Sequence, residues 1–314
     1  MVLYIVQRIL AAIPVMGFVA LFVFLLLRLT PGDPAAIIAG DTATPQQLEA
    51  IRDSLGLNDP LFVQFFSWIG QLLQGDFGTS ILSGQPVIDL ISDRMEPTIS
   101  LALTTIILSV VIGVPLGVIA AWKQGTLIDR FVMLLSVLGF SVPVFVIGYL
   151  MISAFSMSLG WFPVQGFRPI GEGIGPFFHR IALPTFTLTL LYIALIARIT
   201  RTSMLEILGD DYVRTARAKG LPEHKVLMRH ALRNCSVPII TVIGIGFALI
   251  ISGVVVTESV FNLPGLGRLT VDAVLSRDYP VIQAVILLAS LIYVVINLLI
   301  DIAYVLLDPR IRYA

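Results

Sequence analysis

The sequence has few charged residues. Only 13% of its 314 residues are Asp, Glu, Lys or Arg, whereas 57% are hydrophobic. A soluble domain is about a quarter charged and a little under half apolar. Because a chain of this composition cannot cover a water-exposed surface with polar groups, we exclude a soluble enzyme. The 20 basic and 20 acidic residues cancel and give no indication of a nucleic-acid partner.

The residues that carry catalysis or bind metals are also scarce. Cys235 is the single cysteine, which excludes an internal disulfide framework and a Cys-rich metal cluster. His224 and His230 do not have the three- or four-residue spacing that places two side chains on one helix face. The chain contains no G-x-x-x-x-G-K-[ST] phosphate-binding loop, no paired-carboxylate site and no Ser/His/Asp set. We therefore expect no catalytic residue, no metal site and no cofactor in this chain.

Long charge-free stretches dominate the sequence instead. A helix needs about 20 mostly apolar residues to cross the hydrocarbon core. The first stretch exceeds the 7–15 residues of a signal-peptide core, and no small-residue cleavage site follows it. We predict an all-α polytopic membrane protein with six transmembrane helices, at residues 1–29, 98–122, 131–160, 181–202, 235–257 and 280–303.

The distribution of basic residues predicts the orientation. With the N terminus inside, 13 of the Lys and Arg residues fall on the inner side and 7 on the outer side. Because Lys and Arg are enriched on the cytoplasmic side of membrane proteins, we predict that both termini are cytoplasmic. Residues 30–97 then form an extracytoplasmic subdomain, 98–307 the transmembrane core and 308–314 a cytoplasmic tail.

The external segment 30–97 is too long for a simple connection. Thr44 and Pro45 are typical of a helix start, and we expect a short amphipathic helix from there to residue 55. Residues 61–69 predict a second, aromatic-rich helix that lies against the membrane surface. The segment is either a cap over the helix ends or a docking surface for an external partner, and the two interpretations are compatible.

The internal segment 210–233 predicts a helical hairpin. Asp210 and Asp211 supply an N-cap, Gly220 stands where a left-handed C-cap belongs, and Pro222 restarts a helix. A DNA-reading helix pair is excluded because both ends are tethered to the bilayer. A solvated, positively charged loop is the simpler alternative. Small residues on the first helix favour close approach by a partner instead: Thr215, Ala216 and Ala218.

The predicted spans hold almost no ionisable group with which to couple an ion gradient. Arg28 and Glu258 lie at outer helix ends, and Asp301 lies near the inner interface. We therefore expect the energy for transport to come from a partner protein that acts through the hairpin. An ion-driven secondary carrier, or a scaffold or sensor that moves no solute, remain alternatives.

The interior of the predicted spans carries hydroxyl side chains. We expect most of them to pack helices together and a minority to line a polar path: Thr98, Ser100, Thr104, Thr105, Ser109, Ser136, Ser141, Ser153, Ser156, Thr185, Thr187 and Thr189.

The hairpin carries the stretches Asp211-Tyr212-Val213-Arg214-Thr215-Ala216-Arg217-Ala218-Lys219-Gly220-Leu221 and Arg229-His230-Ala231-Leu232-Arg233-Asn234. Four further stretches are distinctive: Leu29-Thr30-Pro31-Gly32-Asp33-Pro34-Ala35, Glu258-Ser259-Val260-Phe261-Asn262-Leu263-Pro264-Gly265-Leu266-Gly267-Arg268, Arg277-Asp278-Tyr279-Pro280 and Asp308-Pro309-Arg310-Ile311-Arg312-Tyr313. Together they resemble binding-protein-dependent ABC importer permeases, with the hairpin as the coupling-helix segment, and more narrowly the B-type permease of the dipeptide/oligopeptide/nickel/glutathione group. Arg214-Thr215-Ala216 replaces the glutamate and two alanines of the general signature, which is the variant of the peptide subgroup. The resemblance covers nearly the whole chain.

The resemblance implies a type I ABC importer fold in a bacterial inner membrane. The implied partners are a homologous second permease in a heterodimer, two cytoplasmic ATPase subunits that bind ATP and Mg, and an extracytoplasmic solute-binding protein. Di- and oligopeptides are the implied substrates; glutathione and nickel complexes stay open, although the lack of mid-membrane metal ligands disfavours bare nickel. The implied ATPase-coupling residues are Asp211, Tyr212, Arg214, Thr215, Ala216, Arg217, Ala218, Lys219 and Gly220. The implied residues of the outer gate or binding-protein face are Asp33, Glu258, Phe261, Asn262, Asp278 and Tyr279.

Overall fold

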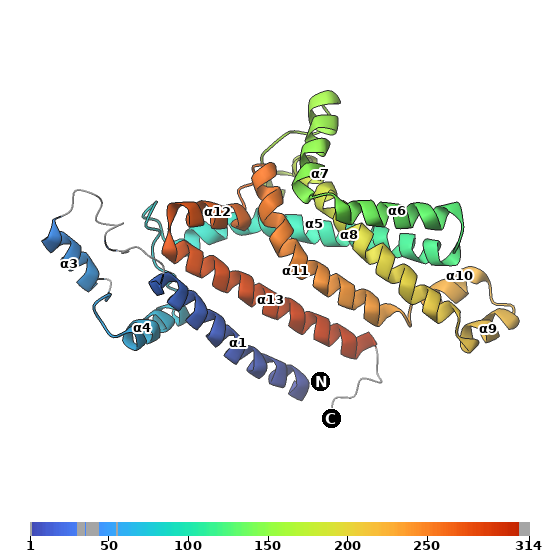
Figure 1. Ribbon diagram of the computed structural model, residues 1–314, viewed down its shortest axis with the longest axis horizontal. Helices are drawn as coiled ribbons and strands as arrows, with labels where there is room; N and C mark the ends of the chain where they lie inside the picture. Colours follow the sequence, from blue (N-terminus) through green and yellow to red (C-terminus); the bar gives the residue numbers. More distant parts are fainter. Residues whose placement is uncertain (1, 30–34, 36–43, 55, 308–314) are drawn as a thin grey trace. The chain divides into compact units, whose positions relative to one another are not determined.

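The computed structural model describes residues 2–29, 35, 44–54 and 56–307, so that Asp33 and the predicted tail at 308–314 lie outside it. The described residues form helices and one isolated antiparallel bridge between Thr79 and Pro86 (Figure 1). The predicted all-α fold is confirmed. The chain forms two compact units: unit 1 is Met1–Met95 with Leu269–Val294, and unit 2 is Glu96–Arg268 with Val295–Ala314.

Five helices in the described part of the chain are long and apolar enough to cross a membrane. A sixth candidate consists of α6 (Leu127–Ser141) and α7 (Val144–Met151), with α7 continued by the π-helical segment η1 (Ile152–Ser158). The axis bends by 104° between α6 and α7. The five are α1 (Val2–Leu29), α5 (Val87–Trp122), α8 (Ile174–Leu208), α11 (Ser236–Val260) and α13 (Tyr279–Leu307).

Proline explains why one predicted span is broken. The sequence predicted a single helix over 131–160, but Val142 leaves the helix with φ −97° and ψ 124°. Pro143 follows it, and a proline ring forces the preceding residue out of the helical region. The next helix starts at Val144, directly after the proline.

Unit 1 contains the two predicted helices of the external segment, α3 (Pro45–Ser54) and α4 (Leu61–Leu73). Thr44 caps α3 reciprocally: its Oγ1 accepts the Gln47 N–H at 3.3 Å, and Gln47 Oε1 accepts the Thr44 N–H at 2.9 Å. The ring of Phe24 in α1 lies 5.3 Å from Phe65 and 5.8 Å from Trp68 of α4. The aromatic face of α4 therefore packs against α1.

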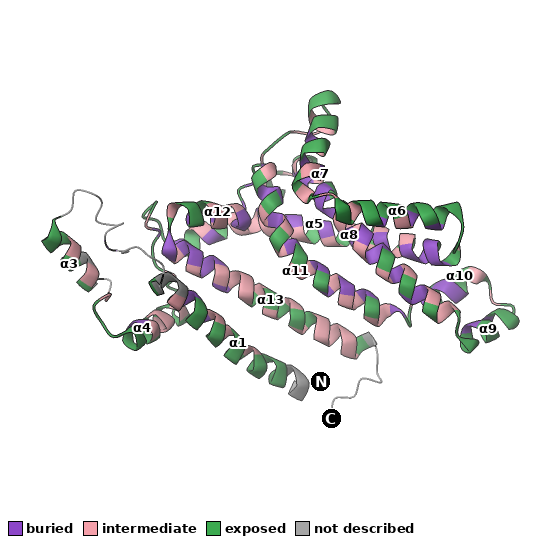
Figure 2. Ribbon diagram, in the orientation of Figure 1, coloured by how far each residue is buried: buried purple, intermediate pink, exposed green. Residues whose placement is uncertain are grey.

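Unit 2 is built around α8. Of its most apolar 18-residue window, 61% is buried, against 28% for α5 and 33% for α11, which makes α8 the central helix (Figure 2). α8 packs against α6, α7 and α11. Close contact with α5 occurs at Gly113 and Gly117, where a Cβ atom would meet Ile196 and Thr200 of α8. A buried apolar cluster of unit 2 joins α5, η1, α8 and α11 with the turn after α11: Leu101, Ile152, Phe177, Ile181, Leu183, Leu188, Tyr192, Ile250, Val254, Phe261 and Leu263.

Candidate functional site

The 210–233 segment forms the predicted hairpin between α8 and α11. It consists of α9 (Asp211–Ala218), α10 (Glu223–Lys225) and a π-helical segment η3 (Val226–Ala231). Asp210 is the N-cap residue of α9, although its side chain makes no capping hydrogen bond. Asp211 is the first helical residue rather than the cap, and its carboxylate accepts a hydrogen bond from Arg214 at 3.3 Å.

Gly220 ends α9 in the predicted left-handed conformation, with φ +76°. Two backbone hydrogen bonds close the turn: the Leu221 N–H bonds the Ala216 carbonyl at 3.3 Å, and the Gly220 N–H bonds the Arg217 carbonyl at 2.9 Å. This pair of bonds defines a Schellman motif, which needs a positive φ at the position that Gly220 occupies. The glycine fixes the direction in which the chain leaves α9.

One face of α9 packs against the rest of the hairpin and the end of α8. Arg217 closes the turn through an ion pair with Glu223 at 2.7 Å, and this hydrogen bond raises the pKa of the Arg217 guanidinium. The Asn234 side chain donates to the Tyr212 hydroxyl oxygen at 2.7 Å and ties α9 to the segment before α11. The apolar base consists of buried Val213, Ala216 and Val226 with Ile207, Leu208 and Leu221 around them. Ala216 therefore lies on the buried face of α9 and not on its exposed face.

The outer side of the hairpin is open. Tyr212 is 40% exposed and the Arg214 side chain 72% exposed. The exposed face combines one aromatic ring with basic groups on a helix whose opposite face is anchored. The exposed residues among the predicted coupling positions are Asp211, Tyr212, Arg214, Thr215, Arg217, Ala218, Lys219 and Gly220.

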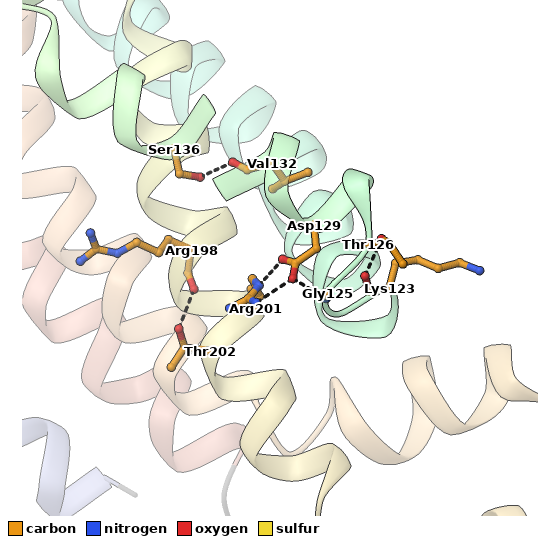
Figure 3. A network of polar contacts seen from close by, with 9 residues as sticks. All are labelled: Lys123, Gly125, Thr126, Asp129, Val132, Ser136, Arg198, Arg201 and Thr202. Carbon is orange, nitrogen blue, oxygen red and sulfur yellow. Dashed lines mark hydrogen bonds and ion pairs between the residues drawn. The ribbon is translucent and has the colours of Figure 1, made fainter. Parts of the chain in front are cut away.

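A buried ion pair joins α8 to α6 on the hairpin side of α8 (Figure 3). Arg201 Nε and Nη2 bond Asp129 Oδ1 and Oδ2 at 2.5 and 2.8 Å, and the Gly125 N–H bonds Oδ2 at 2.9 Å. The side chains are 6% exposed for Asp129 and 20% for Arg201. Such bidentate pairing fixes both distance and orientation. Arg198 points away from the pair in Figure 3. The sequence alone did not indicate this pair, because the two residues are 72 positions apart and no local motif connects them.

A second buried carboxylate, that of Glu258, holds the C-terminal end of α11. Thr98 of α5 donates its hydroxyl to Glu258 Oε1 at 2.5 Å, and the Arg268 N–H bonds Oε2 at 3.0 Å. The Leu266 N–H in turn bonds Thr98 Oγ1 at 2.8 Å. Gly265 lies so close to the carboxylate that a Cβ atom there would collide with it. The turn after α11 is therefore wrapped around a fully buried charge.

The other predicted outer-face residues are mostly inside their own units. In unit 2, Phe261 is 1% exposed, and Asn262 is exposed with φ 51°. In unit 1, Asp278 and Tyr279 are buried, and the Asp278 carboxylate accepts the Ser80 hydroxyl at 2.5 Å and the Ile81 N–H at 3.1 Å. Among the described members of this set only Asn262 offers an exposed side chain, and the carboxylates of Glu258 and Asp278 hold backbone turns.

The helical fold has a counterpart of known structure. The inward-facing MetNI methionine ABC transporter matches with a TM-score of 0.59 and 18% sequence identity, covering 70% of this chain and 97% of that chain. Spanning helices around a central α8, with an exposed hairpin between two of them, are therefore a fold that this chain shares with a chain of that transporter.

The sequence comparisons define the family. Residues 113–313 match the family described as "Binding-protein-dependent transport system inner membrane component", and residues 1–102 match the N-terminal family of the same membrane component. The chain belongs to this family of multi-pass inner-membrane permeases, whose work depends on ATPase and binding-protein partners. The resemblance inferred from the sequence is confirmed.

Three relatives align along almost their full length. A probable peptide ABC transporter permease of Sinorhizobium fredii (strain NBRC 101917 / NGR234) is 57% identical over 310 residues, with 99% of each chain covered. A putative peptide transport system permease of Brucella abortus (strain 2308) is 46% identical over 309 residues, with 98% of each covered. The glutathione transport system permease GsiC of Escherichia coli (strain K12) is 44% identical over 310 residues, with 99% of each covered.

Proposed function

We propose that this chain forms half of the translocation pathway of an ATP-driven importer for di- and oligopeptides. The observation that carries the proposal is the peptide-transporter relative with 57% identity over 99% of both chains. A homologous second permease supplies the other half. Two cytoplasmic ATPase subunits, which bind the ATP and Mg, contact one hairpin each, and an extracytoplasmic solute-binding protein delivers the peptide.

The hairpin supports this assignment because its geometry suits a part that transmits force. The exposed face of α9 is the surface that we assign to the ATPase, and Val213 and Ala216 anchor the opposite face. A push on α9 therefore reaches α8 and α11, to which the hairpin is directly joined. The Asp129–Arg201 ion pair carries the displacement of α8 on to α6. This arrangement fits a rigid-body alternation between two states, driven from the cytoplasm with both termini on that side.

At the outer end we assign the Glu258 cluster to the gate. The carboxylate fixes the turn after α11 to α5, so that these segments move together. Exposed Asn262 lies on that turn and is the described residue that we assign to contact with the binding protein. Within unit 1, Asp278 holds the turn that contains Ser80 and Ile81 through hydrogen bonds to both residues.

Glutathione is the second candidate substrate. It is itself a tripeptide, and the Escherichia coli relative named for glutathione transport is 44% identical over 99% of both chains. The higher identity of the Sinorhizobium relative favours ordinary peptides. Competition between unlabelled glutathione and a labelled dipeptide distinguishes the two.

Reconstitution tests the proposed function. The complete complex, assembled from this chain, the second permease, the ATPases and the binding protein, is placed in proteoliposomes. We expect uptake of a radiolabelled dipeptide that requires ATP on the ATPase side and is unchanged when ion gradients are collapsed. Uptake by this chain alone under an ion or pH gradient, without ATP, would refute the proposal.

A further inference from the structure

A cavity of about 310 Å³ lies in unit 2 beside the bend between α6 and α7. Residues of α5, α6, α7 and α8 line it. At one point of the lining the helices touch, since a Cβ atom at Gly139 of α6 would lie 3.2 Å from the Leu190 carbonyl oxygen of α8. Three of the lining side chains are exposed, so the cavity opens at the surface of unit 2: Leu135, Leu138 and Leu150. We call it the bend cavity.

The lining of the bend cavity is apolar. Ser136 is the single polar residue among the described residues that line it, and its hydroxyl already donates to the Val132 carbonyl of the same helix at 2.9 Å. A buried water needs two to four polar partners, and a peptide needs a partner for each N–H and carbonyl, so the cavity suits neither. An empty apolar cavity costs free energy in proportion to its volume. Because about 150 Å³ already holds a benzene molecule, this cavity has room for part of a hydrocarbon chain.

The length of the bend cavity matches one leaflet of a bilayer. On α6 its lining runs from Val132 to Val142, which is about 15 Å at a rise of about 1.5 Å per residue. On α8 it runs from Leu190 to Ala197, about 10 Å on the same measure. The hydrocarbon core of a bilayer is about 30 Å thick, so that each leaflet contributes about 15 Å. An opening of this length on membrane-spanning helices meets the acyl chains of a single leaflet.

The Asp129–Arg201 ion pair lies beyond the end of the cavity on the hairpin side of α8 (Figure 3). Asp129 stands one turn before the lining residue Val132, and Arg201 stands one turn after the lining residue Ala197. Val132 and Ala197 form a small buried cluster with Ala120 of α5. The ion pair therefore marks the depth at which the apolar lining ends and charged groups begin.

Cations are in excess at this end. Arg201 already balances the carboxylate of Asp129. Lys123 stands two helical turns after Leu116, the lining residue of α5, and its side chain extends away from Asp129 in Figure 3. Its ammonium lies 4.0 Å from the centre of the Trp122 ring, an arrangement suited to the membrane interface. Two cations beside the pair form no ion pair with any residue that the structure describes: Lys123 and Arg130.

We propose that the bend cavity binds an anionic phospholipid from the leaflet on the hairpin side. One acyl chain fills the cavity, and the phosphate group lies against Lys123 and Arg130. The apolar lining and its length select the chain, and the two cations select a negatively charged headgroup over a zwitterionic one. The bound chain completes the packing between α6, α7 and α8, so that these helices move as one body when the hairpin displaces α8. The inference goes beyond the proposed function and does not depend on which solute is carried.

Photolabelling tests the place of the acyl chain. The full complex is placed in nanodiscs with phosphatidylglycerol that carries a diazirine midway along one chain. We expect labels on the buried lining residues Ser136 and Ile147, which lipid at the outer surface does not reach. Val142→Phe narrows the cavity and should reduce this labelling about tenfold, because about two methylene groups lose their contacts. Val137→Phe, the same change at an exposed position of α6 outside the lining, is the matched control and should leave the labelling unchanged.

A second measurement tests the headgroup and does not need the phenylalanine variant. The delipidated complex is titrated with phosphatidylglycerol or phosphatidylcholine, and bound lipid is counted by native mass spectrometry. Phosphatidylglycerol should bind more tightly, and Lys123→Gln should reduce its advantage about fivefold, the contribution of one cation near a membrane surface. Lys225→Gln, which removes the same charge from an exposed position of the hairpin, should not change it.

Three results would overturn the inference. The first is labelling confined to exposed residues, and the second is equal affinity for the two lipids or an equal effect of the two lysine variants. The third is a Val142→Phe variant that fails to assemble with the second permease while the wild-type complex retains no lipid, because the partner chain then fills the cavity. A complex that binds the lipid as expected but shows no ATP-driven uptake supports this inference and refutes the proposed function.

Discussion

Replacement of Gly220 by valine isolates the contribution of one backbone angle to coupling. Gly220 has φ +76°, and nothing lies within 4 Å of the position that a Cβ would take, so an added side chain meets no neighbour. The cost of the substitution is therefore conformational, about 1–2 kcal/mol for an L-residue held in the left-handed region. That energy lowers the population of the native turn about 5- to 30-fold. We expect a corresponding loss of coupling between the hairpin and the ATPase.

The assay is peptide- and binding-protein-stimulated ATPase activity of the assembled complex. Gly220→Val should lose most of the stimulation while the chain still inserts into the membrane, since the hairpin lies outside the spans. Gly220→Asn is the matched control: asparagine adds a side chain in the same open space but adopts the left-handed conformation readily, and it should keep most of the stimulation. Normal stimulation in the valine variant, or equal loss in both variants, would refute the argument from the backbone angle.

The structure also predicts the outcome of two further substitutions and of one alkylation experiment. Asp129→Asn leaves the guanidinium of Arg201 without its carboxylate and should cost about 3 kcal/mol, seen as a lower Tm of the complex in detergent, whereas Glu172→Gln in an exposed pair should leave the Tm unchanged. Glu258→Gln presents a donor to a backbone N–H or hydroxyl inside the outer cluster, and the Tm should fall by the equivalent of about 1–3 kcal/mol; an unchanged Tm would contradict the buried-carboxylate assignment. Burial, with a smaller contribution from a nearby carboxylate, raises the pKa of the Cys235 thiol to about 11, so alkylation by N-ethylmaleimide should stay slow at pH 8 in the native complex and become fast on unfolding. Because the folded chain holds this proton more tightly than the unfolded chain, the associated stability is present at neutral pH and is lost as the pH rises toward 11.

Part of the candidate site was predictable from local sequence. Gly220 after a polar, capped segment and Pro222 at a helix start are short-range signals, and the hairpin formed as they indicated. The face of α9 was harder to predict. Ala216 was expected among the small residues available to a partner. It lies instead on the buried face of α9, in the apolar cluster with Val226, because the segment after the turn folds back against α9.

The outer residues show the limit of local motifs. The family resemblance implied that Glu258 and Asp278 face the binding protein or the outer gate. Each is instead buried and accepts a hydrogen bond from a residue distant in the sequence: Thr98 of α5 lies 160 positions before Glu258, and Ser80 lies 198 positions before Asp278. No periodicity or spacing in a single sequence indicates such pairs.

The sequence by itself indicated the membrane environment, most of the long helices and the place of the hairpin, because apolar length, proline and glycine act over a few residues. The tertiary structure decided which polar groups are partners. The Asp129–Arg201 pair and the Thr98–Glu258 hydrogen bond both depend on helices brought together from distant parts of the chain. A polar group buried in a low-dielectric interior costs free energy unless it is hydrogen-bonded, and only the packing of the helices brings partners from distant parts of the chain within reach.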